Sequence, residues 1–146
     1  MTLMSCNNSN PFLSDWTTPY SIPDFSAVQE KHYIPAVEAG IAQQEAEIQA
    51  IIDNQEAPTF ANVVEAYERS GAILDRVMGV LFNLAETDGT ESLQKIVEQA
   101  LPMLSVHSDN ISMNPAFFAK VEVLYNDMEN LALNREQEMA LKKLYD

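Results

Sequence analysis

Hydrophobic residues recur at steps of three, four and seven along most of the chain, and this spacing predicts α-helices from about residue 24 to residue 146. The first long helix is expected to begin near Pro35, where a missing N–H costs least, and to end near Asp53. Asp24 is expected to cap a short turn before it. The apolar stripe of this helix consists of Ile34, Val37, Ile41, Ile48 and Ile51.

A second helix is predicted from the N-cap residue Thr59 to a stop at Asp88-Gly89. It carries two apolar stripes, so we expect it to be central and buried on more than one side. The first stripe is Phe60, Val63, Tyr67, Leu74, Met78, Leu81 and Ala85; the second is Ile73, Val77, Val80 and Leu84. Tyr67, Leu74 and Leu81 are predicted to be core residues. Ser70-Gly71 would allow a close helix contact or a bend.

Three more helices follow, each with its own start signal. Thr90 is expected to cap the third helix, which Pro102 should kink. Asn114 and Pro115 form an N-cap and N1 pair for the fourth, and Asn134 begins the fifth. The stripes are Leu93, Ile96, Val97, Ala100, Leu104 and Ile111; then Phe117, Val121, Leu124, Met128 and Leu131; then Met139, Leu141 and Leu144.

No stretch alternates with a period of two, and the chain has only four glycines. The predicted fold class is therefore all-α, an antiparallel helical bundle of about five helices. An extended N-terminal arm, residues 1–23, precedes it. The arm contains Pro11, Pro19 and Pro23 among apolar side chains that we expect to lie on the core: Phe12, Leu13, Trp16, Tyr20, Ile22 and, just beyond, Phe25.

Composition narrows the classes of function. A length of 146 residues with 47% hydrophobic residues fits one folded domain. The formal charge of −14 argues against nucleic-acid binding and against docking on anionic membranes. High solubility is the simple interpretation of this charge, and a cationic substrate or partner is the alternative. No run approaches the roughly 20 apolar residues that would span a bilayer.

The single cysteine, Cys6, excludes an internal disulfide and a cysteine-based metal site. Leu3-Met4-Ser5-Cys6 resembles the end of a bacterial lipoprotein signal, and a polar stretch that would suit a tether follows it. The charged and apolar regions of such a signal are missing, so a truncated start and a chance match both stay open. Lipidation of Cys6 would place the protein in the cell envelope, lipid-anchored or periplasmic; otherwise we expect it in the cytoplasm.

The residues alone predict no catalytic residue and no metal ligand in this chain. A zinc peptidase helix needs two histidines one turn apart, as in H-E-x-x-H, but His32 and His107 are the only histidines. His32 is expected to anchor the arm or cap a helix. His107 lies on an apolar stripe and is interpreted as a hydrogen-bonded core or boundary histidine, with a metal ligand as the alternative.

Carboxylate pairs such as Glu45 with Asp53 and Glu65 with Glu68 are interpreted as solvated helix faces. General acid–base catalysis would require a burial that these positions do not promise. The seven methionines are scattered at core positions and form no cofactor-binding motif.

An ordered series of segments resembles a known family. The segments are Asn10-Pro11-Phe12-Leu13, Pro19-Tyr20, Pro23-Asp24-Phe25, His32-Tyr33-Ile34-Pro35-Ala36, Gly40, Ala46-Glu47-Ile48, Phe60, Asn62, Glu68-Arg69-Ser70-Gly71, Leu74 and Arg76-Val77. Together they are similar to the N-terminal region of the bacterial peptidyl-dipeptidases (dipeptidyl carboxypeptidases), in the thimet-oligopeptidase-like family of zinc metallopeptidases. The similarity runs from about Asn10 to at least Phe118.

The resemblance implies a zinc-dependent enzyme, several-fold longer than this chain, that removes dipeptides from the C-termini of short peptides. Its H-E-x-x-H helix would lie downstream, so no catalytic or zinc-binding residue is carried over. The implied cofactor is zinc in the full-length enzyme, with none bound by this chain. The implied partners are the downstream catalytic lobe and short peptides, with this lobe forming one wall of the substrate channel. The alternative is a free-standing acidic helical interaction module.

On this interpretation residues 24–146 are the helical N-terminal lobe of a longer peptidase, truncated at the C-terminal end. The sequence stops at Asp146 inside an amphipathic helix without a capping signal. Met139, Leu141, Leu144 and Tyr145 would then need cover that is missing, so we expect the isolated lobe to expose an apolar patch and to self-associate.

Overall fold

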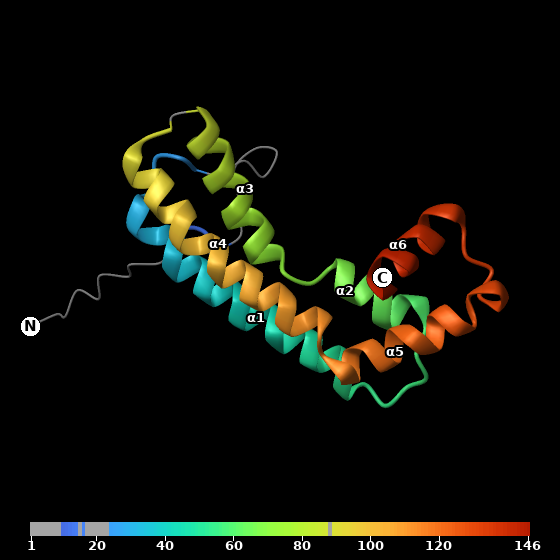
Figure 1. Ribbon diagram of the computed structural model, residues 1–146. Helices are drawn as coiled ribbons and strands as arrows, with labels where there is room; N and C mark the ends of the chain where they lie inside the picture. Colours follow the sequence, from blue (N-terminus) through green and yellow to red (C-terminus); the bar gives the residue numbers. More distant parts are fainter. Residues whose placement is uncertain (1–9, 15, 17–23, 88) are drawn as a thin grey trace, which may run out of the picture. The chain divides into compact units, whose positions relative to one another are not determined.

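The computed structural model describes residues 10–14, 16, 24–87 and 89–146, and Figure 1 shows their helices. The long helices are α1 (Tyr33–Asp53), α3 (Ala72–Thr87), α4 (Glu91–Ser112), α5 (Pro115–Asn126) and α6 (Arg135–Tyr145). Shorter elements are the 3₁₀ helices η2 (Glu30–His32) and η4 (Met128–Asn130), the π-helix η3 (Phe60–Glu65) and the single turn α2 (Ala66–Glu68). These residue ranges contain no strand. The all-α prediction is confirmed.

The chain divides into two compact units. The first unit extends up to Gly40 and includes Ile73–Pro102; the second consists of Ile41–Ala72 and Met103–Asp146. Both α1 and α4 therefore contribute to each unit, and each unit has buried hydrophobic residues of its own.

In the first unit, α3 runs antiparallel to the helices beside it. Its first residues lie at Gly40 of α1, where an added Cβ would lie 2.9 Å from the Leu74 side chain. Glycine at position 40 permits this close approach of α1 and α3. The last turn of α3 lies against α4, where Gln94 Nε2 donates to the Ala85 carbonyl (3.2 Å). The buried core is Phe12, Tyr33, Ala36, Val37, Leu74, Val77, Met78, Val80, Leu81, Ala85, Leu93 and Ala100.

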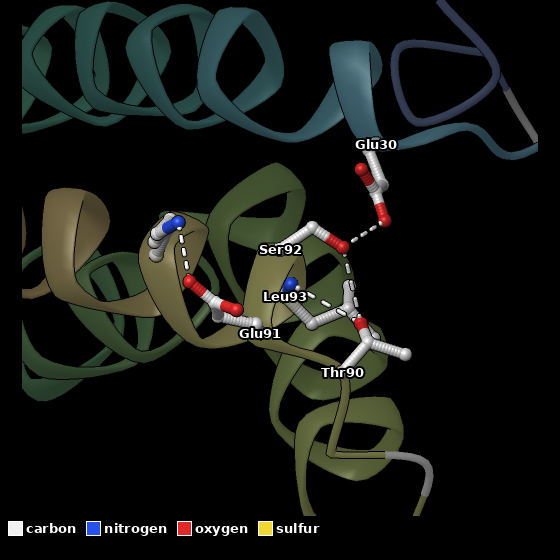
Figure 2. Close-up of polar contacts among 6 residues, drawn as sticks. Glu30, Thr90, Glu91, Ser92 and Leu93 are labelled. Atoms are coloured by element: carbon white, nitrogen blue, oxygen red, sulfur yellow. Dashed lines mark hydrogen bonds and ion pairs between the residues drawn. The ribbon is translucent and has the colours of Figure 1, made fainter.

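Local hydrogen bonds set the start of α4 (Figure 2). Thr90 Oγ1 accepts from the Leu93 N–H (3.3 Å), as its N-cap position predicts. Ser92 Oγ donates to Glu30 Oε1 (2.6 Å), which joins the start of α4 to η2. Both helices therefore begin at the same end of the first unit.

The described part of the arm reaches the core through one aromatic side chain. Phe12 is fully buried and its ring lies 5.1 Å from that of Tyr33. Arg76 Nη1 donates to the Phe12 and Ser14 carbonyls (3.1 and 2.9 Å), and its guanidinium lies over the Trp16 ring. The predicted packing of Phe12 is confirmed. Leu13 and Phe25, by contrast, are largely exposed, so their predicted burial is wrong.

The second unit packs the remainder of α1 and α4 with η3, α5 and α6. Its core residues are Ile48, Ile51, Val63, Val64, Ile111, Phe117, Val121, Leu124 and Leu141. The predicted caps are confirmed: Asn114 Oδ1 accepts from the N–H groups of Ala116 and Phe117, and Asn134 Oδ1 accepts from that of Gln137.

Two predicted helices differ from the structure. The second is not continuous, because Thr59 caps the π-helix η3 and the chain breaks at Arg69–Gly71 before α3 begins. Leu74 and Leu81 are buried as predicted, but Tyr67 is only partly buried. The fourth helix ends at Asn126, and Met128 and Leu131 reach the core from η4 and the residue after it.

Several predictions concern residues outside the described ranges. They are the lipidation of Cys6, the stop at Asp88 and the contributions of Pro19, Tyr20, Ile22 and Pro23 to the arm.

On α6, Leu141 is fully buried, Leu144 and Tyr145 are partly buried, and Met139 is 61% exposed. No helix within the described ranges is both long enough and apolar enough to cross a membrane.

The burial of α3 generates a stability prediction with a control of the same size. Leu81→Ala should lower the free energy of unfolding by about 2–5 kcal/mol, because Leu81 is completely buried. Leu101→Ala, in the same unit, should cost less than about 1 kcal/mol because Leu101 is 47% exposed. Urea unfolding followed by circular dichroism measures both, and equal losses would contradict the assigned core.

Candidate functional site

A break in the helical backbone organises the polar side chains of the second unit. The chain turns at Arg69–Gly71 between α2 and α3, and Gly71 has φ +77°. This left-handed conformation favours glycine. A Cβ on Gly71 would also lie 2.6 Å from Gln44 Nε2. Position 71 therefore requires glycine, because the backbone conformation is left-handed and because Gln44 leaves no room for a Cβ.

Side chains of α1 hold the break from one side. Ser70 is buried; its Oγ donates to the Tyr67 carbonyl (2.6 Å) and accepts from Gln44 Nε2 (3.0 Å). The Gly71 N–H donates to Glu47 Oε2 (2.8 Å), and Glu47 Oε1 accepts from Gln43 Nε2 (2.9 Å). The Gly71 N–H thus finds its partner on α1, and the Ser70 hydroxyl that bonds the Tyr67 carbonyl is held by Gln44, about one turn before Glu47 on the same helix.

His107 extends this network into α4. The ring is 5% exposed, and its Nε2 lies 2.8 Å from Gln44 Oε1. Its Nδ1 is buried, makes no hydrogen bond, and lies 3.9 Å from Glu45 Oε1. The prediction of a hydrogen-bonded core or boundary histidine is confirmed. We call Gln44, Glu47, Ser70, Gly71 and His107 the break network.

A hollow of about 540 Å³ lies beside the break. Its lining combines small apolar side chains with polar ones: Glu47, Ala50, Ile51, Asn54, Ala61, Asn62, Ala66, Arg69 and Ser70. Arg69 Nη1 pairs with Glu65 Oε2 (3.3 Å) at the exposed surface. The Ser70 hydroxyl donates its hydrogen bond to a carbonyl and not to a general base, so it is not activated as a nucleophile. The described residues that line this hollow include no nucleophile–base pair.

A second hollow of about 320 Å³ lies among aromatic side chains of the same unit. Tyr67, Phe117, Phe118 and Tyr145 contribute to its lining. The Tyr125 and Tyr145 rings stack 3.8 Å apart, which fixes the end of α6. Burial, and secondarily the charge of Glu68, raises the pKa of Tyr67. This tyrosine therefore stays protonated at neutral pH.

The other residues considered from the sequence have structural roles. His32 Nδ1 accepts from the Gln29 N–H (3.0 Å), and its carbonyl accepts from Asn10 Nδ2 (2.7 Å), so His32 both caps η2 and anchors the arm. Glu45, Asp53 and Glu68 are exposed and Glu65 is partly exposed, as solvated helix faces would be. No group of three or more potential metal ligands occurs in the part of the chain that the structure describes.

Sequence reasoning missed the contributions of Gln44 and Glu47. Glu47 lies outside the apolar stripe of its helix, whereas Gln44 falls on that stripe, three residues after Ile41 and four before Ile48. A polar residue on the stripe and the Ser70-Gly71 bend were the local signals, and neither indicated that the two segments would be joined.

Comparison with known proteins shows which proteins this chain is similar to. No protein-family model matches the chain. It is 35% identical over 129 residues to a dipeptidyl carboxypeptidase of Salmonella typhimurium and 37% identical over 127 residues to one of Escherichia coli, covering 88% and 87% of this chain. Oligopeptidase A of S. typhimurium is 24% identical over 133 residues. The chain spans 19% of the length of each of these relatives.

The glycine at the break can be tested against a helical glycine of the same chain. Gly71→Ala should lower the free energy of unfolding by about 1–2 kcal/mol or more, because alanine is strained at this φ and meets Gln44. Gly79→Ala should instead raise it by about 0.4–1 kcal/mol, because Gly79 lies inside α3 with nothing within 4 Å of an added Cβ. Chemical denaturation measures both variants, and a stabilising Gly71→Ala would refute the assigned turn.

Proposed function

We propose that this chain is the N-terminal, non-catalytic lobe of a longer peptidase. The chain is similar over most of its length to dipeptidyl carboxypeptidases and, more weakly, to oligopeptidase A. These relatives indicate a thimet-oligopeptidase-like family. The proposed enzyme removes dipeptides from the C-termini of short peptides. The observation that carries the proposal is the 35–37% identity across nearly nine-tenths of this chain.

The break network supports a structural role for the polar residues of this lobe. Ser70 Oγ donates to a carbonyl, Glu47 accepts from Gly71 and Gln43, and His107 Nε2 bonds to Gln44. These groups stabilise the backbone and are not aligned for acid–base or nucleophilic chemistry. The catalytic groups of the proposed enzyme would therefore come from another part of the polypeptide.

Zinc is the cofactor proposed for the full-length enzyme. The histidines of this chain do not fit a zinc site, since a catalytic site needs three protein ligands and His32 already caps η2 through Nδ1. His107 offers one buried Nδ1, with Glu45 as the nearest carboxylate.

A helical lobe can act on the reaction without touching the reacting atoms. In the proposed enzyme it forms one wall of the substrate channel, orients the peptide and excludes bulk water. In the proposed enzyme this wall includes the hollow beside the break, which is lined by small apolar residues and by polar ones. The downstream lobe is the proposed partner. Lipidation of Cys6 and the resulting location in the cell envelope stay predictions.

The proposal predicts different activities for two proteins. The full-length protein should release dipeptides stepwise from the C-terminus of a short N-blocked peptide, and a strong zinc chelator should abolish this release. The 146-residue chain alone should release nothing, because its polar groups are engaged structurally. Mass spectrometry of the products measures both.

Three results would count against the proposal. Release of single amino acids, or no cleavage by the full-length protein, would exclude the proposed activity. Turnover by the 146-residue chain would show that it holds a catalytic site. A gene that encodes no residues after Asp146 would favour the acidic interaction module.

A further inference from the structure

The described residues of the N-terminal arm form a turn that their own hydrogen bonds hold. The Asn10 carbonyl accepts from the Leu13 N–H (3.0 Å), and Asn10 Oδ1 accepts from the Phe12 N–H (3.1 Å). Pro11 fixes the backbone φ at the second position of this turn, and its carbonyl accepts from Trp16 Nε1 (3.1 Å). Because these bonds are local, a short peptide of this sequence loses less conformational entropy when it adopts the same shape.

The start of α1 and the adjoining η2 contact the turn in the first unit. The Phe12 ring is completely buried and lies 5.1 Å from the Tyr33 ring. The His32 carbonyl accepts from Asn10 Nδ2 (2.7 Å). One buried aromatic side chain beside hydrogen bonds to the main chain is an arrangement that peptide-binding proteins use to hold their ligands.

Arg76 of α3 binds the turn from a second helix. Its Nη1 donates to the Phe12 and Ser14 carbonyls (3.1 and 2.9 Å), and its guanidinium carbon lies 5.1 Å from the centre of the Trp16 ring. The two bonds to carbonyls do not depend on which side chains the turn carries, whereas the ring contacts do. Leu13, by contrast, is 46% exposed. These contacts therefore select for the two aromatic side chains of the turn and not for Leu13.

We propose that the surface formed by His32, Tyr33 and Arg76, which we call the arm site, is a peptide-recognition site and that residues 10–16 are its built-in ligand. The ligand class is a short segment with an Asn-Pro-Phe turn and a tryptophan four positions after the phenylalanine. The covalent tether gives the arm an effective concentration on the order of millimolar, so the arm excludes a free segment. When the arm's own contacts are weakened, the arm site binds the same segment from another molecule. This binding is independent of the proposed peptidase activity.

A capped synthetic peptide of residues 10–16, added to the 146-residue variant Phe12→Ala, tests the arm site. We expect saturable NMR shifts of Tyr33 and Arg76, and none in the unsubstituted chain, whose site is filled by its own arm. A peptide with Phe12→Ala should bind more than about tenfold more weakly, because it lacks the buried ring. A peptide with Leu13→Ala should bind within about twofold of the original peptide, because Leu13 is largely exposed.

Circular dichroism checks that the Phe12→Ala chain keeps its helices. If it does not, Asn10→Ala replaces it, because this change removes the hydrogen bonds to the His32 carbonyl and the Phe12 N–H but leaves the buried ring. The absence of saturable shifts up to about 1 mM peptide in the folded variant would overturn the proposal. Equal affinity for the Phe12→Ala peptide, or equal shifts in the unsubstituted chain, would overturn it too, since either result would mean nonspecific binding.

Discussion

The left-handed turn at Gly71 imposes the main constraint on the second unit. It ends one helical segment and begins another, so backbone groups that a continuous helix would pair need other partners. Glu47 accepts a hydrogen bond from the Gly71 N–H, and the Ser70 hydroxyl donates one to the Tyr67 carbonyl. The side chains of α1 can do this only because position 71 carries no Cβ, which would otherwise occupy the place of Gln44.

Capping hydrogen bonds govern the rest of the architecture. Thr59, Thr90, Asn114 and Asn134 each accept from backbone N–H groups at a helix start, which fixes where the chain changes direction. The apolar stripes between these caps are then buried within each unit. Function, on our proposal, follows from rigidity: a wall that positions a peptide must hold its own polar groups in fixed partnerships.

The sequence predicted those features that depend on neighbouring residues. The caps, the end of α1 near Asp53 and the burial of Leu74 and Leu81 are local properties of short segments. The break network could not be predicted in the same way, because Gln44 and His107 are 63 positions apart. The interruption of the second helix was indicated only by Ser70-Gly71, since stripe periodicity continues across the turn. Exposure of Phe25 shows that composition alone does not decide which side chains of an arm are buried.

A double-mutant cycle between Gln44 and Ser70 tests most directly whether the break is held by this network. Gln44→Ala, Ser70→Ala and the double variant would be compared with the parent chain by urea denaturation. Our account predicts a coupling energy within the range of about 0.5–3 kcal/mol that contacting residues show, because each substitution removes the same hydrogen bond. Strictly additive losses would contradict it and would mean that the turn at Gly71 is stable without α1.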